Sequence, residues 1–189
     1  LAYLRYALNP EDLLAEKRQE FNEDSVLKIH HYKTAKYTIP GPLSVGTILA
    51  GASEKHLKAI KDFGIPVGIA FQLKDDELGI FSTEEGLGKP IGSDIRANKV
   101  TLLISKALEF SSDEDRRFLE SAYGNPKITG QDIEKVKEII KKCGALEYSQ
   151  NLSRKLVEEG KQFIPQITDD PKYQQFLSEL ADLGIERTN

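Results

Sequence analysis

The first feature of this 189-residue sequence that could do chemistry is a pair of adjacent carboxylates, Asp75 and Asp76, preceded by the amide of Gln72. On a helix, positions 72, 75 and 76 are spaced i, i+3 and i+4, so the three side chains share one face. Neighbouring carboxylates repel each other, and Mg²⁺ would offset that repulsion because it prefers carboxylate oxygens and keeps water or phosphate in its other positions. The pair alone favours the plainer interpretation, a solvated pair at the end of an amphipathic helix.

Cations and hydroxyls flank this pair on both sides. Downstream, a glycine-rich stretch at residues 88–101 contains Lys89 and Lys99, and upstream Lys33 and Thr34 end a predicted helix. A lysine ammonium is a compact point charge that suits a diphosphate. Each segment by itself is weak evidence, because surface lysines are usually solvated and glycine-rich loops are common.

Taken in order, the segments form four motifs. They are Lys-Thr-Ala-x-Tyr-Thr at 33–38, Pro-Leu-x-x-Gly with Ala-Gly-Ala at 42–52, Gly-x-Ala-Phe-Gln-x-x-Asp-Asp at 68–76, and Gly-Lys-Pro-x-x-x-Asp-Ile-x-x-x-Lys-x-Thr at 88–101. This ordered set resembles the trans-isoprenyl diphosphate synthases of the farnesyl and geranylgeranyl type, which are polyprenyl synthetases. The resemblance covers about residues 12 to 105. A chance occurrence of four such motifs in this order is far less probable than membership of that family.

The resemblance implies an all-α isoprenoid synthase bundle around a deep apolar cavity. In such an enzyme an allylic diphosphate ionises to a carbocation, which isopentenyl diphosphate then attacks, with Mg²⁺ as cofactor. Fixed dipoles and cations suit this chemistry, because they stabilise charge as it forms. The implied site residues fall into three sets: Asp75 and Asp76 for the metal; Lys33, Lys89 and Lys99 for the substrate diphosphate; and Lys33, Thr34 and Gln72 for catalysis.

The resemblance is incomplete at its N-terminal side. Family members carry two aspartate-rich helices, and only the second is present, so we expect Asp-Asp-x-x-Asp upstream of Lys33. Residues 1–189 then form the C-terminal portion of a single isoprenoid synthase domain. Of the family's Gly-Gln-x-x-Asp motif only Asp12 can be carried over. Gly79 stands where the farnesyl-type pattern has a further aspartate, as in archaeal-type geranylgeranyl synthases.

Two other functions compete with a synthase. The chain could be a non-catalytic or regulatory partner subunit of a heteromeric isoprenyl diphosphate synthase, which an upstream Asp-Asp-x-x-Asp in the reading frame would argue against. It could also be another magnesium-dependent helical enzyme such as a terpene cyclase. The Lys-Thr-Ala and Gly-Lys motifs disfavour a cyclase, which needs no second diphosphate substrate.

Composition excludes several other classes. A net charge of −4 argues against a protein that mainly neutralises nucleic acid. The sequence shows neither a membrane span nor a basic and apolar leader, so we expect a cytoplasmic protein. Cys143 is the only cysteine, which leaves no internal disulfide and no cysteine-based zinc site.

His30 and His31 point to different faces of a helix, which favours packing or solvent contact over metal binding. The family resemblance also implies a homodimer.

Helical periodicity accounts for the remaining sequence. Proline should break the first helix at residues 40–42, and Gly64 to Pro66 should kink or restart the third predicted helix. Ser53 is a candidate N-cap, and Thr129 or Gly130 with Asp132 marks a helix start. The predicted helices cover residues 12–37, 43–50, 53–81, from about 100 onward, 113–123, 130–143, 145–163 and 171–185.

Overall fold

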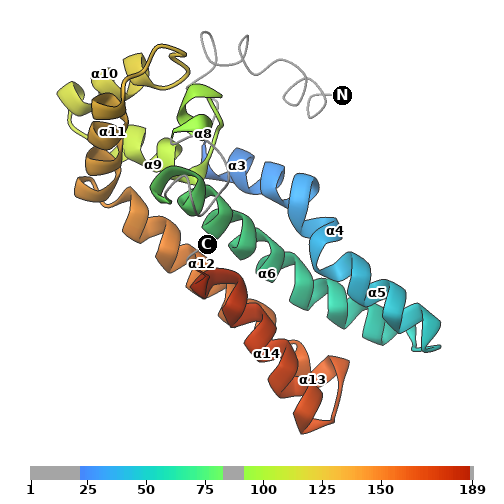
Figure 1. Ribbon diagram of the computed structural model, residues 1–189. Coiled ribbons are helices and arrows are strands. Elements are labelled where there is room, and N and C mark those ends of the chain that lie inside the picture. The colour runs from blue at the N-terminus through green and yellow to red at the C-terminus, as the bar shows by residue number, and fades with distance from the viewer. Residues whose placement is uncertain (1–21, 83–91, 188–189) are drawn as a thin grey trace. The chain divides into compact units, whose positions relative to one another are not determined.

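The described part of the chain is helical. The computed structural model describes residues 22–82 and 92–187, and within them it contains helices and no strand (Figure 1). The prediction of an all-α fold is therefore confirmed. The elements are α3 (Glu23–His30), the π-helix η2 (His31–Ala35), α4 (Lys36–Thr38), α5 (Pro40–Leu49), α6 (Glu54–Phe81), α8 (Ser93–Arg96), α9 (Leu102–Phe110), α10 (Asp113–Ala122), α11 (Gly130–Lys142), α12 (Ala145–Lys161), α13 (Ile164–Ile167) and α14 (Pro171–Glu186).

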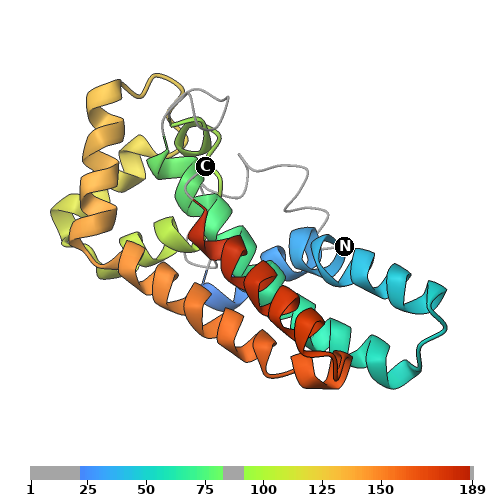
Figure 2. The same cartoon turned by 60° about the horizontal axis from the view of Figure 1, so that its bottom comes forward.

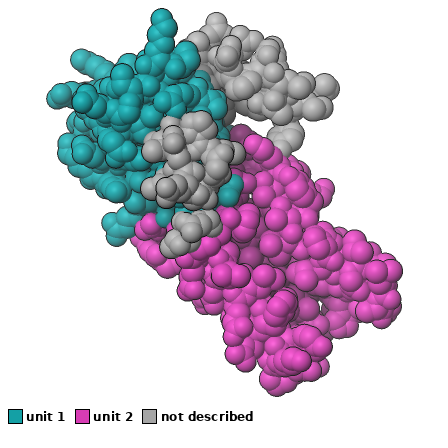
Figure 3. Space-filling view, viewed as in Figure 1, with its two compact units in different colours: residues 1–27, 75–149, 188–189 teal, residues 28–74, 150–187 magenta. Residues whose placement is uncertain are grey.

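The helices gather into two compact units (Figure 3). Among the described residues, unit 1 takes in 22–27, 75–82 and 92–149, and unit 2 takes in 28–74 and 150–187. Three helices, α3, α6 and α12, contribute residues to both units. The two units hold different groups of the predicted site residues.

Unit 1 has a core formed mainly by α9, α10 and α11, which pack against one another. Leu103, Leu119 and Ile140 are completely buried in it. Side chains cap these helices at their N-termini, where the first backbone N–H groups lack a partner within the helix. Thr101 Oγ1 accepts a hydrogen bond from Ile104 N, and Thr129 and Asp132 form a capping box. The predicted start of the helix at Thr129 is therefore confirmed.

Unit 2 has its own core, in which α6 packs against the C-terminal helices. Phe63, Val67 and Ala70 of α6 meet apolar residues of α12, α13 and α14, and Figure 2 shows α14 running beside α6. Gly160 of α12 makes this contact close, because a Cβ there would lie 2.8 Å from the carbonyl oxygen of Phe63. Removing apolar surface from water is the main source of this packing energy.

The helix α6 runs without interruption from Glu54 to Phe81, although it contains Pro66. Of the two outcomes predicted for residues 64–66, a kink or a restart of the helix, the restart is therefore wrong. Gly64, Pro66 and Val67 are all buried here, and Gly64 lies against Pro40. Tertiary packing on several sides outweighs the local cost of proline within the helix.

The first predicted helix is less regular than expected. From residue 22 onward it comprises α3, then the five-residue π-helix η2, then the single turn α4. The predicted break occurs at Ile39, and α5 begins at Pro40 rather than at Leu43. Proline fits the first turn of a helix, because the N–H that it lacks would have no partner there.

Most later boundaries agree with the sequence predictions to within one or two residues. The helices α9, α10, α11, α12 and α14 start where expected, and Ser53 immediately precedes α6. The short helices α8 and α13 were not predicted. Among the described helices, none combines the length and the apolar character needed to cross a membrane.

Candidate functional site

The first polar cluster lies in unit 2 and is built on the π-helix. A π-helix has i to i+5 hydrogen bonds and often marks a functional segment of a helix. Here η2 carries Lys33 and Thr34: Lys33 is exposed and Thr34 is half-buried. The third member of the motif, Ala35, is fully buried and packs against α6.

Thr34 and Gln72 meet although 38 residues separate them in sequence. The Thr34 hydroxyl donates to Gln72 Oε1 over 2.7 Å, and the Thr38 hydroxyl donates to the backbone oxygen of Thr34 over 2.8 Å. A glycine allows this approach, because a Cβ at Gly68 would lie 2.7 Å from Ala35 Cα. Two predicted catalytic residues thus form one oxygen-rich pair, which we call the Thr34–Gln72 pair.

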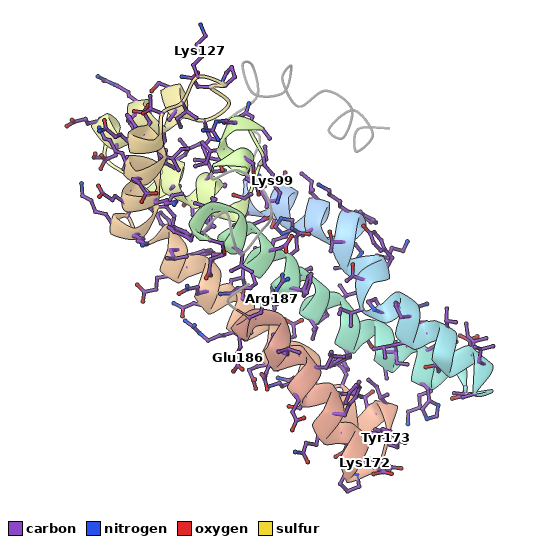
Figure 4. The ribbon with its side chains drawn as sticks, viewed as in Figure 1. Lys99, Lys127, Lys172, Tyr173, Glu186 and Arg187 are labelled. Atoms are coloured by element: carbon purple, nitrogen blue, oxygen red, sulfur yellow. The ribbon has the colours of Figure 1, made fainter. Side chains whose placement is uncertain are left out.

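Arg187 supports the helix just before Gln72. Its guanidinium lies 3.9 Å from the ring centroid of Phe71, and Nη2 donates to the Phe71 carbonyl oxygen over 3.2 Å. A guanidinium over an aromatic face is held by the electrostatic attraction of the ring. Arg187 follows the end of α14 (Figure 4), so the C-terminal helix braces the segment that presents Gln72.

The second polar cluster lies in unit 1 and consists of Asp76, Asp94 and Lys99. Lys99 Nζ is 3.0 Å from Asp76 Oδ1 and 2.9 Å from Asp94 Oδ2. Asp76 is 1% exposed and belongs to α6, whereas Lys99, labelled in Figure 4, comes from the segment between α8 and α9. We call this arrangement the carboxylate–lysine cluster.

The backbone explains how Lys99 returns toward α8. Asn98 has a φ of 55°, in the left-handed region that asparagine tolerates better than most residues. The turn brings Lys99 N within 3.0 Å of the carbonyl oxygen of Asp94, so the two residues are joined through the main chain as well as through their side chains. The pairing of Lys99 with Asp94 is thus a property of the turn that ends α8.

Charge pairing dominates the electrostatics of this cluster. Burial by itself would lower the pKa of Lys99, but the Asp76 and Asp94 carboxylates outweigh it and raise that pKa well above its ordinary value. Burial also raises the pKa of the neighbouring Tyr123 phenol, and the charges of Asp76 and Asp94 act in the same direction. Lys99 is therefore a firmly protonated cation, and the Tyr123 phenol stays neutral near the two carboxylates.

Gly79 makes room for the second carboxylate. A Cβ at Gly79 would collide with Asp94 Oδ2, so a side chain at that position competes with Asp94 for space. The farnesyl-type motif has an aspartate at position 79. In this chain a carboxylate from α8 occupies the region beside that position instead.

The structure thus divides the predicted site residues. It brings Thr34 together with Gln72, and Asp76 together with Lys99, while Asp75 is half-buried on α6 next to Asp76. Lys89 and Asp12 lie outside the described residues. Sequence reasoning assigned no role to Asp94, although it stands in the fourth motif. His30 is 4% exposed, in agreement with the packed role expected for it.

The donor chemistry of α6 fits Mg²⁺. Asp75 and Asp76 supply hard carboxylate oxygens, and Mg²⁺ is commonly bound by one or two carboxylates with substrate phosphates completing its shell. Within residues 22–82 and 92–187, no group of three or more His, Cys, Asp or Glu side chains is arranged to hold a metal ion. A metal here would need further ligands from the substrate or from other parts of the protein.

Comparison with known proteins is consistent with both the motifs and the fold. The structure superposes with a TM-score of 0.82 on a geranylgeranyl pyrophosphate synthase from Corynebacterium glutamicum, crystallised with isoprenyl diphosphate and magnesium, at 31% identity over 98% of this chain and 56% of that one. The fold is therefore the all-α isoprenoid synthase fold. The family model for polyprenyl synthetase matches residues 10–143. The chain belongs to the polyprenyl synthetase family.

Two relatives of known function illustrate the match. A short chain isoprenyl diphosphate synthase from Methanothermobacter thermautotrophicus is 34% identical over 178 residues, which is 93% of this chain and 53% of that protein. A geranylgeranyl diphosphate synthase from Sulfolobus acidocaldarius is 33% identical over 177 residues, again 93% of this chain and 53% of that protein. The chain thus spans about half the length of these relatives.

Proposed function

We propose that this chain is the C-terminal portion of a single-domain, Mg²⁺-dependent prenyltransferase, which condenses isopentenyl diphosphate with an allylic diphosphate to a longer isoprenyl diphosphate. The observation that carries the proposal is the Thr34–Gln72 pair, in which residues of two separate family motifs meet over 2.7 Å. Family membership and the short-chain synthases among the relatives support the same reaction.

The residues have distinct roles in this proposal. Lys33 and Lys89 hold the allylic diphosphate, whose carbon–oxygen bond breaks to leave a carbocation. The oxygens of Thr34 and Gln72 face that developing charge, because dipoles placed in advance stabilise charge without reorganising at the moment of reaction. Asp75 and Asp76 would hold Mg²⁺, which neutralises diphosphate charge when bound. Lys99 was predicted to bind the diphosphate as well.

An elongation assay tests the proposal. The full-length protein is incubated with labelled isopentenyl diphosphate, an allylic diphosphate and Mg²⁺, and products are extracted into organic solvent. We expect elongation by the wild type and a loss of at least about a hundredfold in Asp75→Ala, since the charge of the leaving diphosphate would no longer be offset. Asp169→Ala is the control, because Asp169 is an exposed aspartate outside the motifs.

Two results would contradict the proposal. Unchanged elongation in Asp75→Ala would remove the assigned role of that carboxylate. No elongation by the wild-type protein would favour the alternative, a partner subunit of a heteromeric synthase. The homodimer implied by the family is part of the proposal, and the mass of the full-length protein in solution would test it.

A further inference from the structure

The environment of Lys99 differs from that of a lysine that binds an anionic ligand, because its ammonium is already paired with carboxylates. Two of the three N–H groups of its ammonium can be satisfied by Asp76 Oδ1 and Asp94 Oδ2, at 3.0 and 2.9 Å. Its side chain is 30% exposed, against 2% for Asp76 and 15% for Asp94. The cation therefore faces inward, toward two carboxylates that are more buried than it is.

The charge of the cluster also disfavours direct contact with a diphosphate. Two of its three charged groups are carboxylates, and both already contact the ammonium at 3.0 and 2.9 Å. A diphosphate could reach the Lys99 ammonium only by competing with them. Lys33 is different, because it is exposed on η2.

The cluster also holds the Asp76 side chain in a defined direction. A buried carboxylate requires a counter-ion or several hydrogen bonds, because leaving it uncompensated is costly. Lys99 satisfies Oδ1 of Asp76 and is itself tied to Asp94 by its side chain and its backbone N–H. Residues that orient a metal-binding carboxylate from behind affect metal binding strongly.

We infer that Lys99 is a positioning residue that, together with Asp94, orients Asp76 toward the Mg²⁺ that Asp75 and Asp76 are proposed to hold. In this inference Lys99 does not contact the substrate diphosphate. This inference rests on the proposed function for its metal and substrate. It replaces the diphosphate-binding role that the sequence motif suggests for Lys99. It also gives Asp94 a role as the residue that holds Lys99 in place.

Competitive acetylation of lysines, read by mass spectrometry, tests where Lys99 points. The full-length protein is treated with a limiting amount of acetic anhydride, with and without Mg²⁺ and inorganic pyrophosphate. Lys61 is an exposed lysine on α6 and sets the fast rate. Lys106 sets the slow rate, because it is 8% exposed and paired with Glu23 and Glu109 at 3.1 and 2.8 Å.

We expect Lys99 to react at least about tenfold more slowly than the exposed Lys61, because the two carboxylates that contact its ammonium favour the charged, unreactive form. Adding Mg²⁺ and pyrophosphate should leave the rate of Lys99 unchanged, and Asp94→Asn should increase it. Reaction of Lys99 as fast as Lys61 in the free protein, or its protection only when pyrophosphate is added, would overturn the inference. Protection of Lys33 by pyrophosphate tests the proposed function separately, so the two can fail independently.

Lysine variants test whether positioning matters for the metal. Lys99→Met and Lys106→Met each remove a paired lysine of unit 1, and both should lower the Tm of the full-length protein. Only Lys99→Met should raise the Mg²⁺ concentration for half-maximal elongation, by about tenfold or more, as loss of an orienting partner does elsewhere. Lys99→Arg should recover most of this loss. An equal change in Lys106→Met would show that the effect is one of stability alone.

Discussion

The two polar clusters on α6 solve different physical problems. The Thr34–Gln72 pair is neutral and half-buried, whereas the carboxylate–lysine cluster contains three charged groups around the fully buried Asp76. Neutral dipoles can be left partly exposed at little cost, but a buried charge must be compensated where it lies. Uncharged oxygens that are already in position can therefore stabilise a positive charge that forms during a reaction. Carboxylates that bind a metal ion must instead be held in a fixed position by compensating groups.

The largest expected effect is on stability, and it is expected at the carboxylate–lysine cluster. Lys99→Met leaves Asp76 and Asp94 close together without their shared counter-ion. We expect the free energy of unfolding to fall by about 3 kcal/mol, the lower end for breaking a buried ion pair because Lys99 is partly exposed. Equilibrium unfolding in urea measures it. Lys61→Met, at an exposed site on α6, should change stability by less than about 0.5 kcal/mol.

A smaller loss is expected where η2 touches α6. Gly68→Ala places a Cβ 2.7 Å from Ala35 Cα, and backbone atoms cannot move aside as a side chain can. We expect about 2 kcal/mol of destabilisation from overpacking, measured by urea unfolding, and a parallel loss of elongation as Thr34 moves from Gln72. In Gly46→Ala, where nothing lies within 4 Å of the new Cβ, stability should be unchanged or slightly higher. Equal losses in both variants would contradict the contact.

The Thr34–Gln72 pair itself should matter more for activity than for stability. Thr34→Val removes one hydrogen bond and should cost about 1 kcal/mol of unfolding free energy. Elongation should fall about tenfold, which corresponds to about 1.4 kcal/mol in the barrier. Thr47→Val is the control, because it too removes a single hydrogen bond from a threonine hydroxyl, in this case the 2.8 Å bond that Thr47 donates to the Leu43 carbonyl oxygen. The assignment would be refuted if both variants lost elongation to the same extent.

The smallest net effect is expected at Gly79. Gly79→Ala should gain up to about 1 kcal/mol from helix propensity and lose a similar amount as Asp94 is pushed from Lys99. The unfolding free energy should therefore barely change, while acetylation of Lys99 in the variant becomes faster. A stability gain with no change in the labelling of Lys99 would show that Asp94 does not need the space beside Gly79.

Much of the fold could be predicted from local sequence. Thr129 and Asp132 form the capping box that their spacing suggests, because a cap depends on residues three positions apart. The wrong predictions lie where contacts between residues far apart in sequence determine the local structure. Pro66 remains within α6 because buried neighbours surround this part of the helix, and no pattern within residues 64–66 contains that information.

The candidate site divides in the same way. Spacing placed Gln72 near Asp75 and Asp76, and the motifs named Thr34 and Lys99, but sequence could not show which side chains meet. The contact between Lys99 and Asp94 depends on the left-handed Asn98, which turns the chain after α8. Asn followed by Lys gives only a weak signal for such a turn. The role of Asp94 thus became visible only through its geometry.

The π-helix has a consequence for how this segment can change. A π-turn closes over one residue more than an α-turn, so it takes up an extra residue without changing the faces that the flanking helical segments present. Removing one residue from 31–35 would restore α-helical spacing, and the change in direction would be confined to side chains within the turn. Lys33 and Thr34 lie in that turn, so the extra residue affects where these two side chains point while the rest of the helix keeps its packing.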